Sequence, residues 1–312
     1  MSRRAWLLFC LMAVLWGIPY LFIKVAVAQV SPLTLVFVRT ALASLLLLPL
    51  ATRRRALAGL GGRLGWVMAL ACVGIAGPFL LISLGEEWIP SSLSGLLVAT
   101  EPLFVALLAV RVDPTERVRG GRRWGLLVGF AGVVCLLGLD VGPHPALLAG
   151  AAMVVAAAFG YATGALIVKR RFHGVPPLGV ATAAVTTAAV VLLPGAVLTA
   201  PSRVPSPPAL AALAVLGVAC TALAYLAFYA LIGLAGASRA AVITYLNPAV
   251  AVALGVAALG EALTWTTALG FVLVVAGSWL STGGRLLPRG LRLPGLSRPP
   301  ARHPPGSPGG SG

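Results

Sequence analysis

The chain alternates long apolar stretches with short polar or basic segments over most of its length. Apolar runs of about 18 residues or more predict membrane-spanning helices, because the hydrocarbon core of a bilayer is about 30 Å thick. Backbone N–H and C=O groups in lipid must be paired within the protein, which also favours helices. The pattern predicts ten spans, near residues 6–27, 32–50, 66–84, 91–110, 123–140, 146–168, 178–199, 209–232, 238–258 and 264–282.

Composition supports a membrane protein rather than a soluble one. Hydrophobic residues make up 59% of the 312 residues and charged residues only 10%, whereas soluble domains average about 45–50% and about 25%. An apolar excess of this size does not fit inside one water-soluble core. We therefore predict an all-α integral membrane protein surrounded by the lipid bilayer.

The positions of the basic residues predict how the helices are oriented. The net charge is +16, but lysine and arginine form short clusters between apolar runs, which argues against nucleic-acid binding. With the N-terminus inside, Arg203 is the only basic residue in an outward-facing loop. Because cytoplasmic loops carry the excess of lysine and arginine, we expect a plasma-membrane protein with both termini in the cytoplasm.

No recognisable pattern of residues for a metal, a cofactor or a nucleotide is present. The four cysteines fall in separate predicted spans, and the three histidines are far apart in loops or the C-terminal region. The phosphate-binding pattern GxxxxGK[ST] does not occur, so ATP hydrolysis is not expected. Residues 283–312 are rich in glycine, proline and arginine, and we predict a disordered basic tail there.

The second half of the chain repeats the first. The best-matched segments are SSLSGLLVATEPLFVALLAV and ASRAAVITYLNPAVAVALGV, which are residues 91–110 and 237–256. A Glu-Pro pair in the first segment corresponds to an Asn-Pro pair in the second. A further match joins residues 116–132 to residues 261–277. Matches across several helices are poorly explained by chance similarity of apolar sequence.

Each repeat is predicted to hold five helices, at residues 5–140 and 146–282. Because five is odd, the two halves cross the membrane in opposite directions. The arginine-rich loop of the first half, at 111–123, corresponds to a loop without basic residues in the second, as opposite orientations require. The predicted fold is thus ten transmembrane helices in two inverted five-helix repeats, an arrangement typical of secondary transporters that bind their solute near the bilayer midplane.

These segments resemble the EamA domains of the drug/metabolite transporter superfamily. The resemblance rests on Trp16-Gly17, on FVRTALASLLLLP at 37–49, on the Glu-Pro or Asn-Pro of the fourth helix in each half, and on Gly260-Glu261. It covers about residues 5–282. The resemblance implies a carrier of amino acids, metabolites or drugs and does not indicate which of these the solute is.

Glu101 is the first candidate for a functional residue. It lies about 15 Å along its helix from Ser91, which is close to the middle of the bilayer. A carboxylate at this depth is costly unless it is paired or protonated, so acids within the membrane are functional candidates. It could bind a proton or a coupling cation; the alternative is a structural role at a helix break. Asn247 occupies the equivalent position in the second half and cannot titrate.

Pro102 and Pro248 follow these two residues and are expected to interrupt their helices near the midplane. Proline has no N–H and leaves one carbonyl unpaired a turn earlier. In a membrane that carbonyl must face protein or a water-filled cavity. A bend that makes no contact with solute is the alternative interpretation.

Further candidates lie in other spans. Arg39, about 10 Å into the second span, could hold an anionic group of the solute or pair with Glu101; packing is the alternative. Lys24 is nearer a span end, where its ammonium group is expected to reach the membrane surface. Aromatic residues within spans are candidates to line a cavity: Trp16, Tyr20, Tyr161, Tyr225, Tyr229 and Tyr245.

These features predict a secondary transporter that exports a small organic metabolite, amino acid or drug-like solute by alternating access. Proton coupling through Glu101 is a hypothesis within this prediction. The alternative is an integral-membrane enzyme acting on a lipid-linked substrate, which would need paired carboxylates or histidines at a membrane face. Glu86-Glu87 is the only adjacent acidic pair, and no histidine is near it in the sequence. We therefore do not expect an enzyme.

Overall fold

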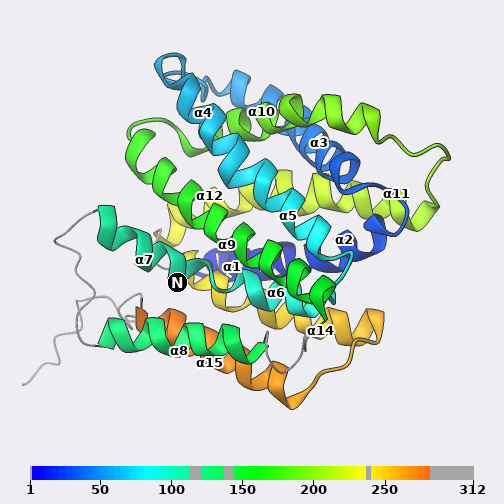
Figure 1. The fold of residues 1–312 in the computed structure, drawn as a ribbon. Coiled ribbons are helices and arrows are strands. Elements are labelled where there is room, and N and C mark those ends of the chain that lie inside the picture. The colour runs from blue at the N-terminus through cyan, green and yellow to red at the C-terminus, as the bar shows by residue number, and fades with distance from the viewer. Residues whose placement is uncertain (1, 113–120, 137–143, 237–239, 282–312) are drawn as a thin grey trace, which may run out of the picture.

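The structure, a computed structural model, describes residues 2–112, 121–136, 144–236 and 240–281. Every regular element in these ranges is a helix (Figure 1). Glu116 and the tail predicted at 283–312 lie outside the described residues. The prediction of an all-helical protein is therefore confirmed for the part of the chain that the structure describes.

Within the described ranges, eight helical segments are long and apolar enough to cross a membrane: Arg3–Val27, Pro32–Arg53, Gly61–Gly85, Ser91–Ala109, Pro145–Arg171, Pro177–Leu198, Pro207–Ala235 and Val242–Leu259. Two shorter apolar helices, Arg123–Cys135 and Trp265–Ser281, accompany them. The chain is thus a multi-pass membrane protein.

Five of these segments form single helices: α3 (Pro32–Arg53), α8 (Gly121–Cys135), α9 (Pro145–Arg171), α10 (Pro177–Leu198) and α15 (Trp265–Ser281). The others are interrupted. In the first half, the first segment divides into α1 (Arg3–Gly17) and α2 (Pro19–Val27), the third into η1 (Gly61–Arg63), α4 (Leu64–Ala71), η2 (Cys72–Ala76) and α5 (Gly77–Gly85), and the fourth into α6 (Ser91–Val98) and α7 (Glu101–Val112). In the second half, one segment divides into α11 (Pro207–Ala214), η5 (Val215–Leu223) and α12 (Ala224–Ala235), and the next into η6 (Ala241–Tyr245) and α14 (Asn247–Leu259).

Proline marks the start of several helices. Pro32, Pro145, Pro177 and Pro207 stand at the first positions of α3, α9, α10 and α11. A missing N–H has no consequence at this position, because the first N–H groups of a helix have no partner within it. Ser31 completes the start of α3 by accepting a hydrogen bond from the Thr34 N–H at 3.2 Å.

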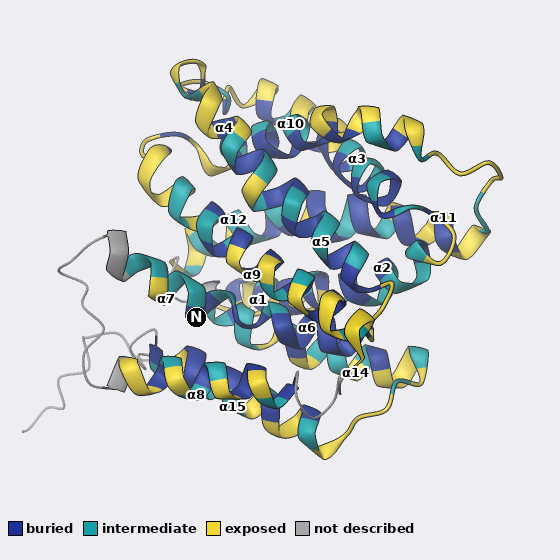
Figure 2. Cartoon of the chain, in the orientation of Figure 1, coloured by how far each residue is buried: buried dark blue, intermediate teal, exposed yellow. Residues whose placement is uncertain are grey.

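The outer surface of the bundle is apolar. Leu45 of α3, Val190 of α10 and Val272 of α15 are 70%, 65% and 59% exposed. Figure 2 shows such exposed positions along the outward faces of the helices, with buried positions between the helices. An apolar surface of this extent is unfavourable in water, and it suits contact with lipid acyl chains.

Polar side chains join α3 of the first half to α10 of the second half, and these two helices lie side by side (Figure 1). The hydroxyl groups of Ser44 and Thr186 are 2.6 Å apart. Nearer the start of α3, the Ser31 hydroxyl lies 2.8 Å from the Thr199 hydroxyl. Such hydrogen bonds across helices satisfy polar groups that lipid cannot.

Glycines allow α8 and α15 to pack closely along one side of the molecule (Figure 1). A Cβ atom added at Gly277 of α15 would overlap the backbone nitrogen of Gly129 on α8. A Cβ added at Gly132 of α8 would lie 2.7 Å from the backbone nitrogen of Val274. Small residues at a crossing let two backbones approach, which is a major source of helix association in membranes.

Replacing Gly277 by alanine is therefore expected to destabilise the protein, because the added methyl group has no space between the two backbones. Overpacking of this kind costs roughly 1–3 kcal/mol. Gly233→Ala is the matched control, since a Cβ at Gly233 in α12 has no atom within 4 Å. Thermal melting of the purified proteins in detergent measures the difference, and equal melting temperatures for the two variants would contradict the packing.

Candidate functional site

Two helices are interrupted at equivalent positions of the two halves. In the first half, α6 ends at Val98 and α7 begins at Glu101. In the second half, a 3₁₀ segment ends at Tyr245 and α14 begins at Asn247. Glu101 and Asn247 are therefore the first residues of half-helices, where the free backbone N–H groups carry partial positive charge.

The side chains at these two positions are short of partners. No described residue forms a hydrogen bond or an ion pair with the carboxyl group of Glu101, which is partly exposed inside the bundle. The Asn247 Oδ1 atom is buried, and it too has no hydrogen-bond partner among the described residues. Buried polar atoms are nearly always hydrogen-bonded in native proteins, so the unpaired Asn247 Oδ1 atom at the start of α14 is unusual.

Arg39 of α3 lies in the core of the bundle, with 5% of its surface exposed. Its Nε atom donates a hydrogen bond to the Thr221 hydroxyl at 2.9 Å, and its Cζ atom lies 3.7 Å from the centre of the Phe79 ring. No described residue accepts a hydrogen bond from its two terminal nitrogens, and no ion pair joins it to Glu101. The guanidinium group is held in place with its fork available to an anion.

A π-helical segment explains how Thr221 orients Arg39. The Thr221 hydroxyl donates to the Leu216 carbonyl at 2.8 Å, five residues earlier in η5. Its oxygen therefore remains free to accept from the arginine. Segment η2 in the third helix of the first half is also π-helical. Such segments are frequent at functional sites, and no sequence signal used above predicts them.

Three of the aromatic candidates lie near both Arg39 and Glu101. Tyr20, Tyr161 and Tyr225 are all close enough to interact electrostatically with both charged residues. Tyr161 also packs edge-on against Phe79, with ring centres 6.3 Å apart. Tyr225 stacks on Tyr229 at 6.1 Å. The structure thus brings together residues from α2, α3, α5, α7, α9 and the η5–α12 segment.

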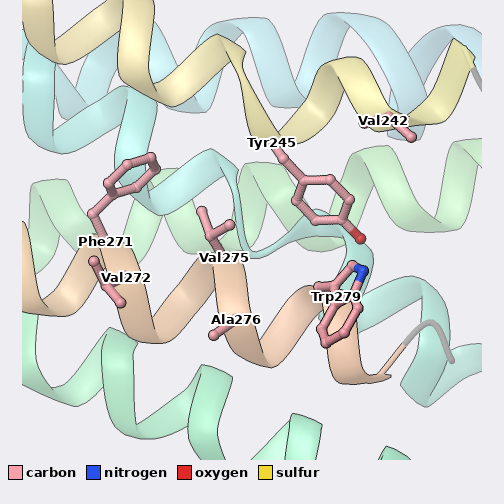
Figure 3. Close-up of a pocket in the computed structure, with 7 residues that line it drawn as sticks. All are labelled: Val242, Tyr245, Phe271, Val272, Val275, Ala276 and Trp279. Carbon is pink, nitrogen blue, oxygen red and sulfur yellow. The ribbon is translucent and has the colours of Figure 1, made fainter. Parts of the chain in front are cut away.

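Two other aromatic candidates lie elsewhere. Trp16 precedes the interruption at Ile18 and packs on Phe228, with ring centres 4.8 Å apart. Tyr245 lines an apolar pocket of about 420 Å³ with residues of α15 (Figure 3). In that view its ring points toward Trp279. Trp16 and Tyr20 belong to different helices, because α1 ends at Gly17 and α2 begins at Pro19.

A contact between the two halves joins a residue just after α14 to the start of α6, and sequence reasoning missed it. One carboxylate oxygen of Glu261 accepts hydrogen bonds from the Ser91 N–H at 2.8 Å and the Ser91 hydroxyl at 2.9 Å. The other oxygen accepts from the Ser92 N–H at 2.9 Å. Gly260 adopts φ +66°, which ends α14 and directs Glu261 to the start of α6. We name this contact the Glu261 clasp.

The charge of Glu261 is stabilised at this helix start. Partial burial acts to raise the pKa of the carboxyl group, but the hydrogen bonds from Ser92 and Ser91 outweigh it and hold the pKa below its ordinary value. Next to the clasp, α6 and α14 approach so closely that a Cβ on Gly95 would overlap that of Ala251. The sequence Gly260-Glu261 contributed to the family resemblance, but it did not indicate that Glu261 would bind Ser91 and Ser92 of α6.

Lys24 has specific partners in the segment that follows α5. Its ammonium group donates hydrogen bonds to the main-chain carbonyls of Glu86 and Ile89, the second at 3.0 Å. These two residues lie between the spans Gly61–Gly85 and Ser91–Ala109. Three basic or acidic side chains, Lys24, Glu86 and Glu261, gather at this end of the bundle.

An all-helical membrane protein with a polar site at two interrupted helices is typical of membrane transporters. The sequence matches the model of the EamA-like transporter family twice, over residues 3–138 and 148–283. The chain therefore belongs to the EamA-like transporter family, within the drug/metabolite transporter superfamily.

Individual relatives agree with this family. The chain is 27% identical over 305 residues to a "Probable amino-acid metabolite efflux pump" of Salmonella typhimurium, which covers 95% of this chain and 100% of that protein. It is 28% identical over 171 residues to a protein of the same name in Escherichia coli, with coverage of 54% and 55%. An "Uncharacterized transporter" of Archaeoglobus fulgidus is 27% identical over 138 residues, which are 43% of this chain and 47% of that protein.

A solved structure supports the fold alone. The crystal structure of a protein with 23% sequence identity superposes with a TM-score of 0.64, and the match covers 90% of this chain and 97% of the other. Family membership and the names of the relatives point to a transporter rather than an enzyme.

Proposed function

We propose that the chain crosses the membrane ten times, as two inverted five-helix repeats at residues 5–140 and 146–282. The two matches to the family model begin and end near these limits. The pairing of α8 with α15 is also what a pseudo-two-fold axis would give, because these are the last helices of the two halves. The charge distribution of the loops supports an orientation with both termini in the cytoplasm, and we propose the plasma membrane as the location.

We propose that the protein exports a small organic solute by alternating access, with amino acids as the first class to test. The free fork of Arg39, held beside Phe79 and Tyr161, carries this proposal. Arginine binds a carboxylate through two parallel hydrogen bonds, and aromatic rings bind cationic or apolar groups. Glu101 and the half-helix starts supply the remaining polar contacts. The names of the bacterial relatives favour the same solute class.

Glu101 is the proposed proton-coupling residue. Three tyrosines interact electrostatically with both Glu101 and Arg39, and no described residue forms a hydrogen bond or an ion pair that would fix the charge of Glu101. Binding of a proton in one conformation and release in the other would couple solute movement to the pH gradient. Asn247, at the equivalent position, cannot titrate, and its unpaired Oδ1 atom is available to accept a hydrogen bond from the solute.

Reconstitution in liposomes tests the function directly. Purified protein is expected to accelerate the movement of at least one amino acid or related metabolite across the membrane, and an imposed pH gradient is expected to change the rate. Liposomes that contain no protein supply the baseline. No movement of any member of a panel of amino acids, organic acids and cationic drugs would contradict the proposal.

A further inference from the structure

Glu86 is a second acid inside the bundle, and it is more deeply buried than Glu101. It follows the last residue of the third spanning segment, at the end of α5, and its side chain is 0% exposed. Both of its carboxyl oxygens are buried without a hydrogen-bond partner among the described residues. A buried charge without a partner is strongly unfavourable, so this carboxyl group is expected to be neutral.

Lys24 is near Glu86 but its hydrogen bonds go elsewhere. The ammonium group donates to the main-chain carbonyls of Glu86 and Ile89, and within the described residues it forms no ion pair with the Glu86 carboxyl. The other charged residues that act on this carboxyl are Glu261 and Arg39. Burial, opposed by Lys24, holds the pKa of Glu86 well above its ordinary value.

Tyr20 connects this acid to the proposed transport site. Its side chain is 8% exposed, and it interacts electrostatically with both Glu86 and Glu101. Tyr20 also lies beside Gly95 of α6, the helix whose start is held by the Glu261 clasp. Glu261, which forms the clasp, also acts electrostatically on Glu86, so the acid lies near the contact between α6 and α14. Separation of these two helices is expected to admit water to it.

We propose that Glu86 is a second proton-binding residue, which holds a proton while the Glu261 clasp is closed and releases it to the outer solution when α6 and α14 separate. On release, the proton passes to water, and the Lys24 ammonium group becomes the counter-ion of the carboxylate. The role in transport rests on the proposed function, but proton binding by Glu86 does not.

Infrared difference spectroscopy of the purified protein between acidic and alkaline pH tests proton binding without any solute. The wild type is expected to show the C=O bands of protonated carboxyl groups inside the bundle. Glu86→Gln is expected to lose the component that comes from Glu86, while any component from Glu101 remains. Glu87→Gln is the matched control, because Glu87 is the exposed neighbour. An identical spectrum for wild type and Glu86→Gln would overturn the proposal.

Thermal melting gives a second measure. A carboxyl group whose pKa is raised on folding stabilises the folded state most at low pH, and this contribution is lost as pH rises toward the folded-state pKa. Glutamine does not titrate. The melting temperature of Glu86→Gln is thus expected to exceed that of the wild type by a margin that widens as pH rises from about 4.5, the ordinary pKa of glutamate. A margin that is constant with pH, or that narrows, would overturn the proposal.

Transport separates this inference from the proposed function. Glu86→Gln is expected to retain exchange of labelled for unlabelled solute and to lose acceleration by a pH gradient. Loss of exchange as well would show a role in the solute pathway and would overturn the proton-release role. If the wild type carries no solute, the proposed function fails, while the infrared and melting results still decide whether Glu86 binds a proton.

Discussion

Glu101→Gln is expected to uncouple transport from the pH gradient. Glutamine preserves the size and polarity of the side chain at the start of α7, but it cannot bind or release a proton. Coupling free energies between two bound species are typically 1–3 kcal/mol, so the stimulation by a pH gradient is expected to fall by about 5- to 150-fold. The measurement is uptake into proteoliposomes with and without the gradient.

The control for this experiment is Glu87→Gln, which removes an exposed acid and is expected to leave both rates unchanged. Solute exchange at equal pH on both sides tests whether Glu101→Gln still binds solute and changes conformation. If the variant responds to the gradient as the wild type does, Glu101 is not the coupling residue.

Arg39→Lys is expected to weaken binding of anionic solutes while the protein remains folded. Lysine keeps the positive charge beside Phe79, but it cannot bond to Thr221 and present a planar fork to a carboxylate at the same time. Hydrogen bonds to charged groups contribute about 1.5–3 kcal/mol, which corresponds to a rise in KM of roughly 10- to 150-fold. Initial rates of uptake over a range of solute concentrations measure this change.

Thr221→Val tests the orientation of the Arg39 guanidinium group without changing its charge. It removes the acceptor of the Arg39 Nε bond and leaves the guanidinium group intact, so a smaller rise in KM is expected. Neutral solutes carried by the protein should be unaffected by either variant. An unchanged KM for carboxylate-bearing solutes in Arg39→Lys would exclude Arg39 as the anion-binding residue.

Much of the architecture could be predicted from local sequence. The apolar runs identify the spans, because the requirement to pair every backbone group in lipid leaves helices as the solution. The positions of Glu101 and Asn247 could be singled out for the same reason. An acid or amide followed by proline stands out in an apolar run, and in the structure each of these residues begins a half-helix.

The contacts between distant residues could not be predicted in this way. Arg39 bonds to Thr221 and Glu261 bonds to Ser91 and Ser92, and each pair joins the two halves of the chain. Hydropathy describes one helix at a time, and it does not indicate which face of a helix meets which neighbour. The π-helical segment that presents Thr221 has no recognised sequence pattern.

The sequence by itself determined that this protein lies in a membrane, that it is helical, that it contains two related halves, and which polar residues are placed deep in apolar surroundings. These properties follow from solvation and from the pairing of backbone groups within each segment. Only the tertiary structure decided which of those residues meet. It brought three tyrosines within electrostatic range of both Arg39 and Glu101 and placed Trp16 and Tyr245 in other surroundings. It also buried the Glu86 carboxyl group without a hydrogen-bond partner among the described residues. Which helices meet depends on how closely they can pack, and small residues at particular positions decide where two helices can approach.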